Sequence, residues 1–496
     1  MYREEHEPAC PSHLESLGSA AAAAPELTPQ SSTLSTPEPG GFRELIRLAW
    51  PLVLSSSFWT IQLFLDAIFL SWYNQSAVGA AMSAALVFWT PFILLQVTAN
   101  YATTFVAQYL GAGRKERVGP AIWQALYFAV VTGLLFLGLR LVADDIFALV
   151  GHDPAVRQME LTYFGCLCFC ALPMLITSSC NAFFAGRGES RVVLLVDAVG
   201  TITNGTMGFF LIFGYFGMPR LGIAGAGWGM VMGSWMAAAV AFGMMMRTRY
   251  RAEFATLSGW RFEGALFRRL MRFGLPAGLQ WCLDGLAFTV FITVIGRIGT
   301  VELSASSIAH RINLLAFLPM LGVGQAVAIM VGQRLGQNKP ELAERSAKTG
   351  LKLAAIYMAI VAVLYVVTPG LFTAGFAVGA DPEQWHLVEP LVRTLLIFIA
   401  VYSLFNSVEL VYTFALRGAG DTVFVTWISI SLSWPFMVLP TVLLAWKQGW
   451  GLYWAWGFAS FYIIAIAFVF MLRFRTGKWK SMRVIEHAPA AGISGQ

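Results

Sequence analysis

The sequence predicts an all-α membrane protein with twelve transmembrane helices in two lobes of six. Of its 496 residues, 57% are hydrophobic and only 12% are charged, whereas about 25% are charged in soluble globular proteins. Long apolar segments recur along the chain, and two motifs of its first half return in its second half at a constant spacing. The composition indicates a membrane protein, the segments give the number of helices, and the repeated motifs predict the two lobes.

Twelve apolar segments are each long enough to cross about 30 Å of hydrocarbon, which takes about 20 helical residues. Short breaks rich in turn-forming residues, such as GAGRKE, RGES and RGAGD, separate some of them. The expected spans are 46–72, 77–110, 120–149, 160–185, 190–216, 221–246, 270–298, 302–335, 350–376, 389–416, 421–446 and 450–473.

An even number of spans places both chain ends on the same side of the membrane. Basic residues concentrate on that side, for example in 114–117, 247–272 and 473–480, and such an excess marks the cytoplasmic side. The net charge of +6 therefore reflects topology, and no nucleic-acid partner is expected. We expect a multi-pass protein of the lipid bilayer of the cell (inner) membrane with both termini in the cytoplasm.

The two halves contain related motifs. FRELIRLAWP at 42–51 resembles FRRLMRFGLP at 267–276, and VAQYLGAGRKE at 106–116 resembles VGQRLGQNKPE at 331–341. Both pairs are 225 residues apart (267 minus 42 and 331 minus 106). Six spans per repeat make the repeats parallel, with a pseudo-twofold axis along the membrane normal. The expected organisation is a disordered cytoplasmic tail (1–41), a first lobe (42–247), a cytoplasmic linker (248–266), a second lobe (267–475) and a cytoplasmic C-terminal tail (476–496).

Several motifs resemble the multidrug and toxic compound extrusion (MATE) family over about residues 42–475. They are VAQYLGAG with its basic loop, NGTMGFFLIFG before LGIAGAG, AHRINLLAFLPMLGVGQA and LRGAGDT. The resemblance implies a two-lobed antiporter that is not an enzyme and needs no cofactor besides the transported H⁺ or Na⁺. It would export amphipathic, often cationic, small molecules in exchange for the inward coupling ion, and we expect a monomer.

Asp66 lies within the apolar stretch QLFLDAIFL of the first expected helix, fifteen residues after Pro51. A charge near the centre of a bilayer costs at least about 2.5–3.5 kcal/mol, so such residues usually carry function. The alternative is a carboxylate that reaches water at the outer end, because Trp72 and Tyr73 follow closely. The resemblance ties Pro51 and Asp66 to ion-dependent bending of the first helix.

Asp197, Thr201 and Asn204 stand at positions i, i+4 and i+7 of the fifth span and share one helical face. A polar face within a bilayer must point toward other helices or water. The resemblance places Asn204 beside a carboxylate four residues later, where this chain has Gly208. Asp197 is a candidate to compensate in part, although it lies nearer the cytoplasmic start.

In the second lobe, the resemblance implies cation coupling at Asp284, where relatives usually carry Glu. It also matches Asn406 to an acidic ion ligand, with Tyr402 one turn earlier. The charge here is displaced to Glu409, which neighbours Asn406 at i+3. Asp284, Asn406 and Glu409 are thus the candidates for a Na⁺ or proton site, and no other metal site is expected.

His310 and Arg311 lie inside the eighth expected span. His310 suits a structural role better than a proton relay. For Arg311 we expect an ion pair with Asp284 or Glu409, which would favour a proton over Na⁺ as the coupling ion.

Two other functions compete with the antiporter. A lipid-linked saccharide or lipid flippase of the same superfamily would use a cationic cavity, whereas these spans contain mainly acids. A polytopic membrane enzyme would need clustered His, Cys or Asp at the membrane face. The chain has no GxxxxGK[ST] phosphate-binding loop, so ATP-driven transport by this chain alone is not expected.

Overall fold

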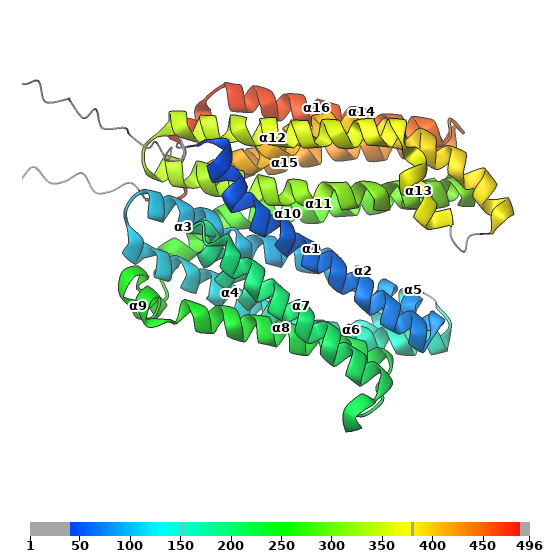
Figure 1. Cartoon of the computed structure of the whole chain (residues 1–496), viewed down its shortest axis with the longest axis horizontal. Coiled ribbons are helices and arrows are strands. Elements are labelled where there is room, and N and C mark those ends of the chain that lie inside the picture. Colours follow the sequence, from blue (N-terminus) through cyan, green and yellow to red (C-terminus); the bar gives the residue numbers. More distant parts are fainter. Residues whose placement is uncertain (1–39, 151, 378–380, 487–496) are drawn as a thin grey trace, which may run out of the picture. The chain divides into compact units, whose positions relative to one another are not determined.

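The computed structural model describes residues 40–150, 152–377 and 381–486. All regular elements in these ranges are helical, and twelve helical segments among them are long and apolar enough to cross a membrane (Figure 1). The predicted all-α architecture with twelve spans is therefore confirmed. The expected tail over residues 1–39 and the last ten residues lie outside the described part of the chain.

The first half begins with α1 and ends with α8. Its helices are α1 (Phe42–Tyr73), α2 (Gln75–Asn100), α3 (Ala102–Gly111), η1 (Lys115–Arg117), α4 (Val118–Gly138), η2 (Leu139–Leu141), α5 (Ala143–Val150), α6 (Pro154–Gly186), α7 (Ser190–Phe213), η3 (Tyr215–Gly217) and α8 (Ile223–Met245). Two short helices follow in the linker region, α9 (Thr248–Phe254) and η4 (Ser258–Trp260).

The second half begins with α10. Its helices are α10 (Gly264–Ile298), α11 (Thr300–Gly336), α12 (Pro340–Val367), α13 (Pro369–Ala377), α14 (Pro382–Ala419), α15 (Thr422–Ser433), η5 (Trp434–Val438), η6 (Thr441–Lys447), α16 (Leu452–Arg475) and η7 (Lys478–Ser481).

Two expected spans differ from the observed helices by about eight residues or more at one end. The span expected at 120–149 stops at η2, because Ala143–Val150 forms the separate helix α5. The span expected at 350–376 begins ten residues earlier, at Pro340, and ends at Val367 before Pro369. The polar first turns of α12 conceal its start from a search for apolar residues, and proline lacks the N–H that would continue the helix.

The helices pack in two sets that correspond to the two repeats. α6, α7 and α8 pack together in the first, and α11, α12, α14 and α16 pack together in the second. Between the repeats, α1 lies against α11, and α10 lies against α2. These two contacts are equivalent under the 225-residue offset, since α1 corresponds to α10 and α2 with α3 corresponds to α11. The contact pattern thus has the pseudo-twofold symmetry expected from the motifs.

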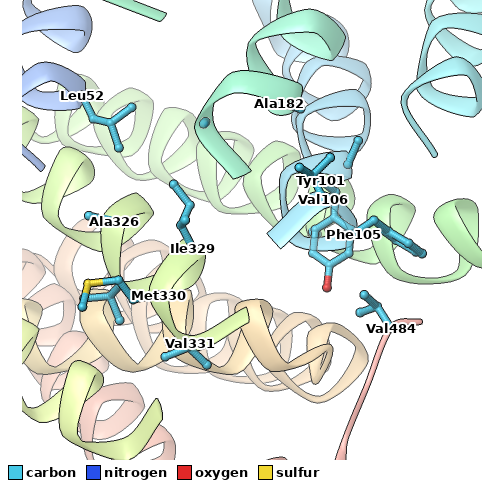
Figure 2. Packing of buried hydrophobic residues seen from close by; sticks show 14 of the residues in the cluster. Leu52, Tyr101, Phe105, Val106, Ala182, Ala326, Ile329, Met330, Val331 and Val484 are labelled. Atoms are coloured by element: carbon cyan, nitrogen blue, oxygen red, sulfur yellow. The ribbon is translucent and has the colours of Figure 1, made fainter. Parts of the chain in front are cut away.

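One hydrophobic cluster joins both repeats and the chain's C-terminal segment. Phe105 of α3, Ile329 of α11 and Val484 are each about 1% exposed or less (Figure 2). Trp479 of η7 is fully buried in the same cluster. Residues 476–486, expected as part of a tail, therefore include side chains that belong to the folded core.

Two glutamines bridge the repeats near the helix ends on the side where the described residues begin, at Gly40, and end, at Glu486. Gln108 Nε2 donates to the carbonyl of Gly418 at 3.0 Å. Its repeat counterpart Gln333 donates to the carbonyl of Gly186 at 2.9 Å. The backbones approach so closely here that a Cβ at Gly111 or its counterpart Gly336 would overlap the opposite repeat. The lobes are thus joined at this end.

Candidate functional site

Asp66 of α1 and Asn204 of α7 form a buried polar pair in the first lobe. The Asn204 Nδ2 atom donates to Asp66 Oδ1 at 3.2 Å and lies 3.4 Å from Oδ2. Asp66 is 5% exposed and Asn204 is 1% exposed, so the alternative of a carboxylate in open water at the outer end does not hold. A carboxylate held by one neutral amide keeps lone pairs for a proton or a cation.

The space one turn beyond Asn204 is open. A Cβ added at Gly208 meets no atom within 4 Å, at the position where the resemblance expects a carboxylate. The Asn204 Oδ1 atom is buried and accepts no hydrogen bond from the described residues. The first-lobe site therefore has one carboxylate and one free amide oxygen, with space for a Cβ at Gly208 one turn further along α7.

Asp197 lies in a separate polar cluster two turns earlier on α7. Its Oδ1 accepts from Asn181 Nδ2 at 3.1 Å, and its Oδ2 accepts from the Ser55 hydroxyl. Ser55 is one turn after Pro51, which lies inside the continuous helix α1. Asp197 and Asn204 thus both contact α1, as their shared face predicted, and the buried Thr201 lies between them on α7. Asp197 ties α1 to α6 and α7.

The second lobe contains a cluster of three charged groups. Asp284 of α10 and Glu409 of α14 lie close enough to interact electrostatically with each other and with Arg417 of α14. Thr413 donates to Glu409 Oε1 at 2.9 Å. Asp284 Oδ1 is buried and accepts no hydrogen bond in the described chain. One unsatisfied carboxylate oxygen in a buried site is a candidate ligand for a proton or cation.

The guanidinium of Arg417 donates its hydrogen bonds to neutral acceptors and not to these carboxylates. Its Nη2 atom donates to Gln280 Oε1 at 2.7 Å and lies 3.4 Å from the carbonyl of Ala277. Gln280 in turn donates to the Ser429 hydroxyl at 2.7 Å. Among the described residues, no ion pair within 4 Å joins Arg417 to Asp284 or Glu409. Both carboxylates therefore interact electrostatically with Arg417, but neither forms an ion pair with it.

The expected ion pair of Arg311 with Asp284 or Glu409 is wrong. Arg311 is exposed on α11 and forms no ion pair within 4 Å in the described ranges. The positive charge near both acids is that of Arg417. His310 is partly buried, with its ring centroid 4.2 Å from that of Phe288.

Tyr402 and Asn406 lie on α14 but have different surroundings. The buried Tyr402 hydroxyl accepts from Asn313 Nδ2 at 3.4 Å, and Asn406 is partly buried. The structure brings together Asp284 and Glu409, and Tyr402 contacts α11 instead.

Arg417 and Gln280 are the members of this cluster that sequence reasoning missed. The expected span ended at residue 416, which left Arg417 among the cytoplasmic basic residues. Helix α14 continues to Ala419, and its end is covered by the other lobe, so that Arg417 is buried. The signal is the LRGAGDT motif, which served above only as a turn and as one of the motifs of the family resemblance.

The sequence pattern of the MatE family matches residues 51–210 and 276–443, one segment in each repeat. The chain belongs to the MatE family. The matched segments contain both polar sites described above. Members of the family are transporters, and the twelve apolar helices make this MatE protein a multi-pass integral membrane protein.

Curated relatives span most of this MatE chain. The probable multidrug resistance protein NorM of Brucella suis biovar 1 (strain 1330) is 26% identical over 384 residues, which are 76% of this chain and 80% of that protein. The protein of the same name from Rhizobium meliloti (strain 1021) is 24% identical over 434 residues, 86% of this chain and 90% of that protein.

Solved structures share the fold. An outward-facing multidrug resistance MATE family transporter of the MOP superfamily superposes with a TM-score of 0.81 at 18% identity, covering 89% of this chain and 97% of that chain. A eukaryotic MATE transporter gives a TM-score of 0.77 at 16% identity, covering 88% and 96%. These structures support the two-lobed twelve-helix architecture predicted from the sequence.

Proposed function

We propose that this MatE protein is an antiporter that exports cationic, amphipathic small molecules in exchange for inward H⁺ or Na⁺. The observation that carries the proposal is the placement of Asp66, Asp284 and Glu409 within membrane-spanning helices, with no ion pair within 4 Å to a basic side chain of the described chain. Intramembrane acids of this kind mark ion and substrate pathways. The relatives named above as probable multidrug resistance proteins support drugs as the substrates.

The charge balance of the second-lobe site favours exchange of one positive charge at a time. Two ionised carboxylates and Arg417 sum to a net charge of −1, counted as −2 plus +1. One proton, one Na⁺ or one monovalent organic cation therefore neutralises the site. Two ligands that compete for one net charge exclude each other, and this mutual exclusion is the thermodynamic requirement for exchange.

The lobes would expose these sites alternately to the two sides of the membrane. Contacts between the repeats join the ends of α3 and α11 to those of α14 and α6, on the side of Gly40 and Glu486. We assign that side to the cytoplasm from the excess of basic residues, so that the state described here is closed toward the cytoplasm. Cation binding from outside would then displace the substrate outward.

The concentration gradient of the coupling ion is sufficient for export. One elementary charge that enters down a membrane potential of about 100 mV yields about 2.3 kcal/mol, and a monovalent cation that leaves costs the same amount, so the electrical work cancels in one-for-one exchange. At about 1.4 kcal/mol per tenfold, a tenfold inward gradient of H⁺ or Na⁺ sustains a roughly tenfold outward gradient of the substrate. No nucleotide is required for such a cycle.

The test is transport in proteoliposomes that contain the full-length protein. Export of a fluorescent monovalent cation is measured under an imposed pH or Na⁺ gradient for the wild type, Asp66→Asn and Asp284→Asn. Asp145→Asn, an exposed position on α5, is the matched control for the same chemical change. We expect gradient-dependent export in the wild type and control and its loss in at least one of the other two variants. Unchanged gradient-driven export in both site variants contradicts the proposal.

A further inference from the structure

An ion pair joins the two lobes at one of two symmetry-equivalent positions. The guanidinium of Arg334 on α11 donates from Nη2 to Glu44 Oε1 at 2.7 Å and to Oε2 at 3.0 Å. Glu44 lies in the first turn of α1. This contact is on the same side of the protein as the Gln108 and Gln333 bridges.

The equivalent position in the other repeat cannot form that pair. The 225-residue offset maps Glu44 onto Arg269 and maps Tyr109 onto Arg334. At the second position, therefore, the guanidinium of Arg269 replaces the carboxylate of Glu44, and the phenol of Tyr109 replaces the guanidinium of Arg334. Two hydrogen-bond donors face each other, and the shared acceptor is missing from the repeat itself.

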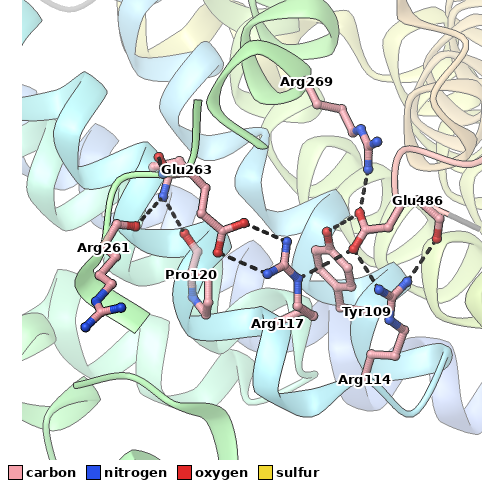
Figure 3. A network of polar contacts seen from close by, with 9 residues as sticks. Tyr109, Arg114, Arg117, Pro120, Arg261, Glu263, Arg269 and Glu486 are labelled. Atoms are coloured by element: carbon pink, nitrogen blue, oxygen red, sulfur yellow. Dashed lines mark hydrogen bonds and ion pairs between the residues drawn. The ribbon is translucent and has the colours of Figure 1, made fainter. Parts of the chain in front are cut away.

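Glu486, in the C-terminal segment, provides a carboxylate at this position. Tyr109 Oη donates to Glu486 Oε2 at 2.8 Å, and Arg269 Nη1 donates to the same oxygen (Figure 3). Arg114 Nη2 donates to Oε1 at 2.7 Å, while its Nη1 donates to the Glu486 backbone carbonyl at 2.9 Å. Arg117 Nε lies 3.5 Å from Oε1. Three arginines and one tyrosine thus surround a single carboxylate.

The segment that carries Glu486 is anchored to both lobes. The backbone N–H of Val484 donates to Gln108 Oε1 at 2.9 Å. Arg483 donates to Asn338 at 3.4 Å, and Lys480 forms an ion pair with Glu344 of α12. Gln108 thereby binds the second lobe through its amide nitrogen and the C-terminal segment through its amide oxygen.

We propose that Tyr109, Arg114, Arg117 and Arg269 form a carboxylate-binding site between the lobes. The C-terminal segment with Glu486 occupies this site reversibly and holds the lobes together, and is therefore called the bolt. Glu486 supplies the acceptor that the second repeat lacks, and so completes a closure with pseudo-twofold symmetry. Three of the four donor residues belong to the first lobe and only Arg269 belongs to the second. Glu486 therefore cross-links the lobes, and separation of the lobes on this side must break its contacts with one of them.

Hydrogen–deuterium exchange of the full-length protein in lipid nanodiscs tests the bolt. We expect Glu486→Gln to speed amide exchange in residues 106–113 and 331–338 by about tenfold, because it removes charge-assisted hydrogen bonds from the closed state. Glu486→Asp keeps the charge and should restore part of the protection. Glu341→Gln, an exposed position on the same side, is the matched control and should leave the exchange unchanged.

An ion pair introduced at the second position shows whether Glu486 acts by joining the lobes or only by stabilising its immediate surroundings. Tyr109→Arg combined with Arg269→Glu copies the Glu44–Arg334 pair into the second position. In that background Glu486→Gln should change the exchange less than twofold, because the repeat now has its own acceptor. An equal effect of Glu486→Gln in both backgrounds, or no effect in the wild-type background, overturns the proposal.

The consequence for transport rests on the alternating access proposed above, whereas the exchange experiment does not. If Asp66→Asn and Asp284→Asn leave export coupled while Glu486→Gln still loosens the contact, the proposed function fails and the bolt stands. If the carboxylate variants uncouple export and Glu486→Gln changes no exchange rate, the bolt fails and the function stands.

Discussion

Gln108 and Gln333 hold equivalent positions in the two repeats, and each donates a hydrogen bond to a glycine carbonyl of the opposite repeat. Their acceptors, Gly418 and Gly186, are themselves equivalent at an offset of 232 residues (418 minus 186). The same contact is therefore made twice around the pseudo-twofold axis. Closure on this side depends on both copies.

Loss of either glutamine should open this side of the protein. A neutral hydrogen bond contributes about 1 kcal/mol, so Gln333→Leu should raise the open population about fivefold. Gln108→Leu should have the larger effect, since Gln108 also accepts from Val484. Distance distributions between spin labels at the exposed positions 116 and 341 provide the measurement, with Gln448→Leu as control. Equal distributions in all variants contradict this expectation.

Asp66→Asn should increase the stability of the protein and abolish the coupling of export to the ion gradient. An amide costs less to bury than an ionised carboxylate, and Asn has nearly the same shape. We expect the free energy of unfolding to rise by on the order of 1 kcal/mol, while export loses its dependence on the pH or Na⁺ gradient. Thermal unfolding and vesicle transport measure the two effects. A variant that melts at a lower temperature and remains coupled argues against a cation site at Asp66.

Gly208→Asp should strengthen cation binding in the first lobe. A Cβ at this position meets no atom within 4 Å. A second carboxylate beside Asp66 and Asn204 should raise the affinity for Na⁺ about tenfold, equivalent to about 1.4 kcal/mol. Titration with Na⁺ of the purified protein measures this change. The neutral Gly208→Asn is the control for volume, and an equal gain in that variant would refute the electrostatic explanation.

Arg417→Gln should change the charge of the second-lobe site from −1 to −2. Two neighbouring carboxylates without a nearby cation repel each other when both are ionised, so the pH profile of export should differ from that of the wild type. The loss of the bond to Gln280 should also destabilise the protein by about 1.5–3 kcal/mol. Arg417→Lys keeps the charge and should preserve the pH profile. Identical pH profiles for Gln and Lys variants exclude a role for this charge.

The stabilisation of the folded protein by Glu486 should be lost when the pH is lowered. Burial would raise the pKa of this carboxyl, but its backbone hydrogen bond, the bond from Tyr109 and the charges of Arg114 and Arg117 together lower the pKa below its ordinary value. A lowered pKa in the folded state stabilises the protein above the unfolded pKa of about 4.3, and the effect is lost as pH falls through the folded value.

The difference in melting temperature between wild type and Glu486→Gln measures this dependence. It should be constant from about pH 7 to pH 5 and vanish at lower pH. Added salt should reduce it at neutral pH, because the ions are partly exposed. A difference that grows as pH falls from 7 to 5 contradicts this assignment.

The symmetric scaffold could be predicted because it depends on patterns along the chain. Apolar stretches set the spans, and the constant offset set the repeat, so that Gln108 and Gln333 were recognisable as equivalents before their partners were known. The observed helices differ from the expected spans where a helix has polar turns beyond its apolar segment, as α12 does from Pro340.

The composition of the second-lobe site could be predicted only in part. Asp284 and Glu409 stand out because any acid in an apolar helix does. Arg417 was missed because the exposure of a basic residue at a helix end depends on what the opposite lobe covers. Arg311 was wrongly paired because its position within α11 does not by itself say which side chains its face of the helix meets. The acceptor for Tyr109 and Arg269 was equally hidden, since Glu486 is distant in sequence and lies in a segment expected as a tail.

Binding of a monovalent organic cation by the purified protein in weakly buffered solution tests the central claim most directly. If the carboxylates of both lobes serve cation exchange, binding should release about one proton, or one Na⁺ when the protein is first loaded with it, for each organic cation bound. Asp66→Asn or Asp284→Asn should reduce that release. Binding without release of either ion, at any pH or Na⁺ concentration tested, would contradict the account.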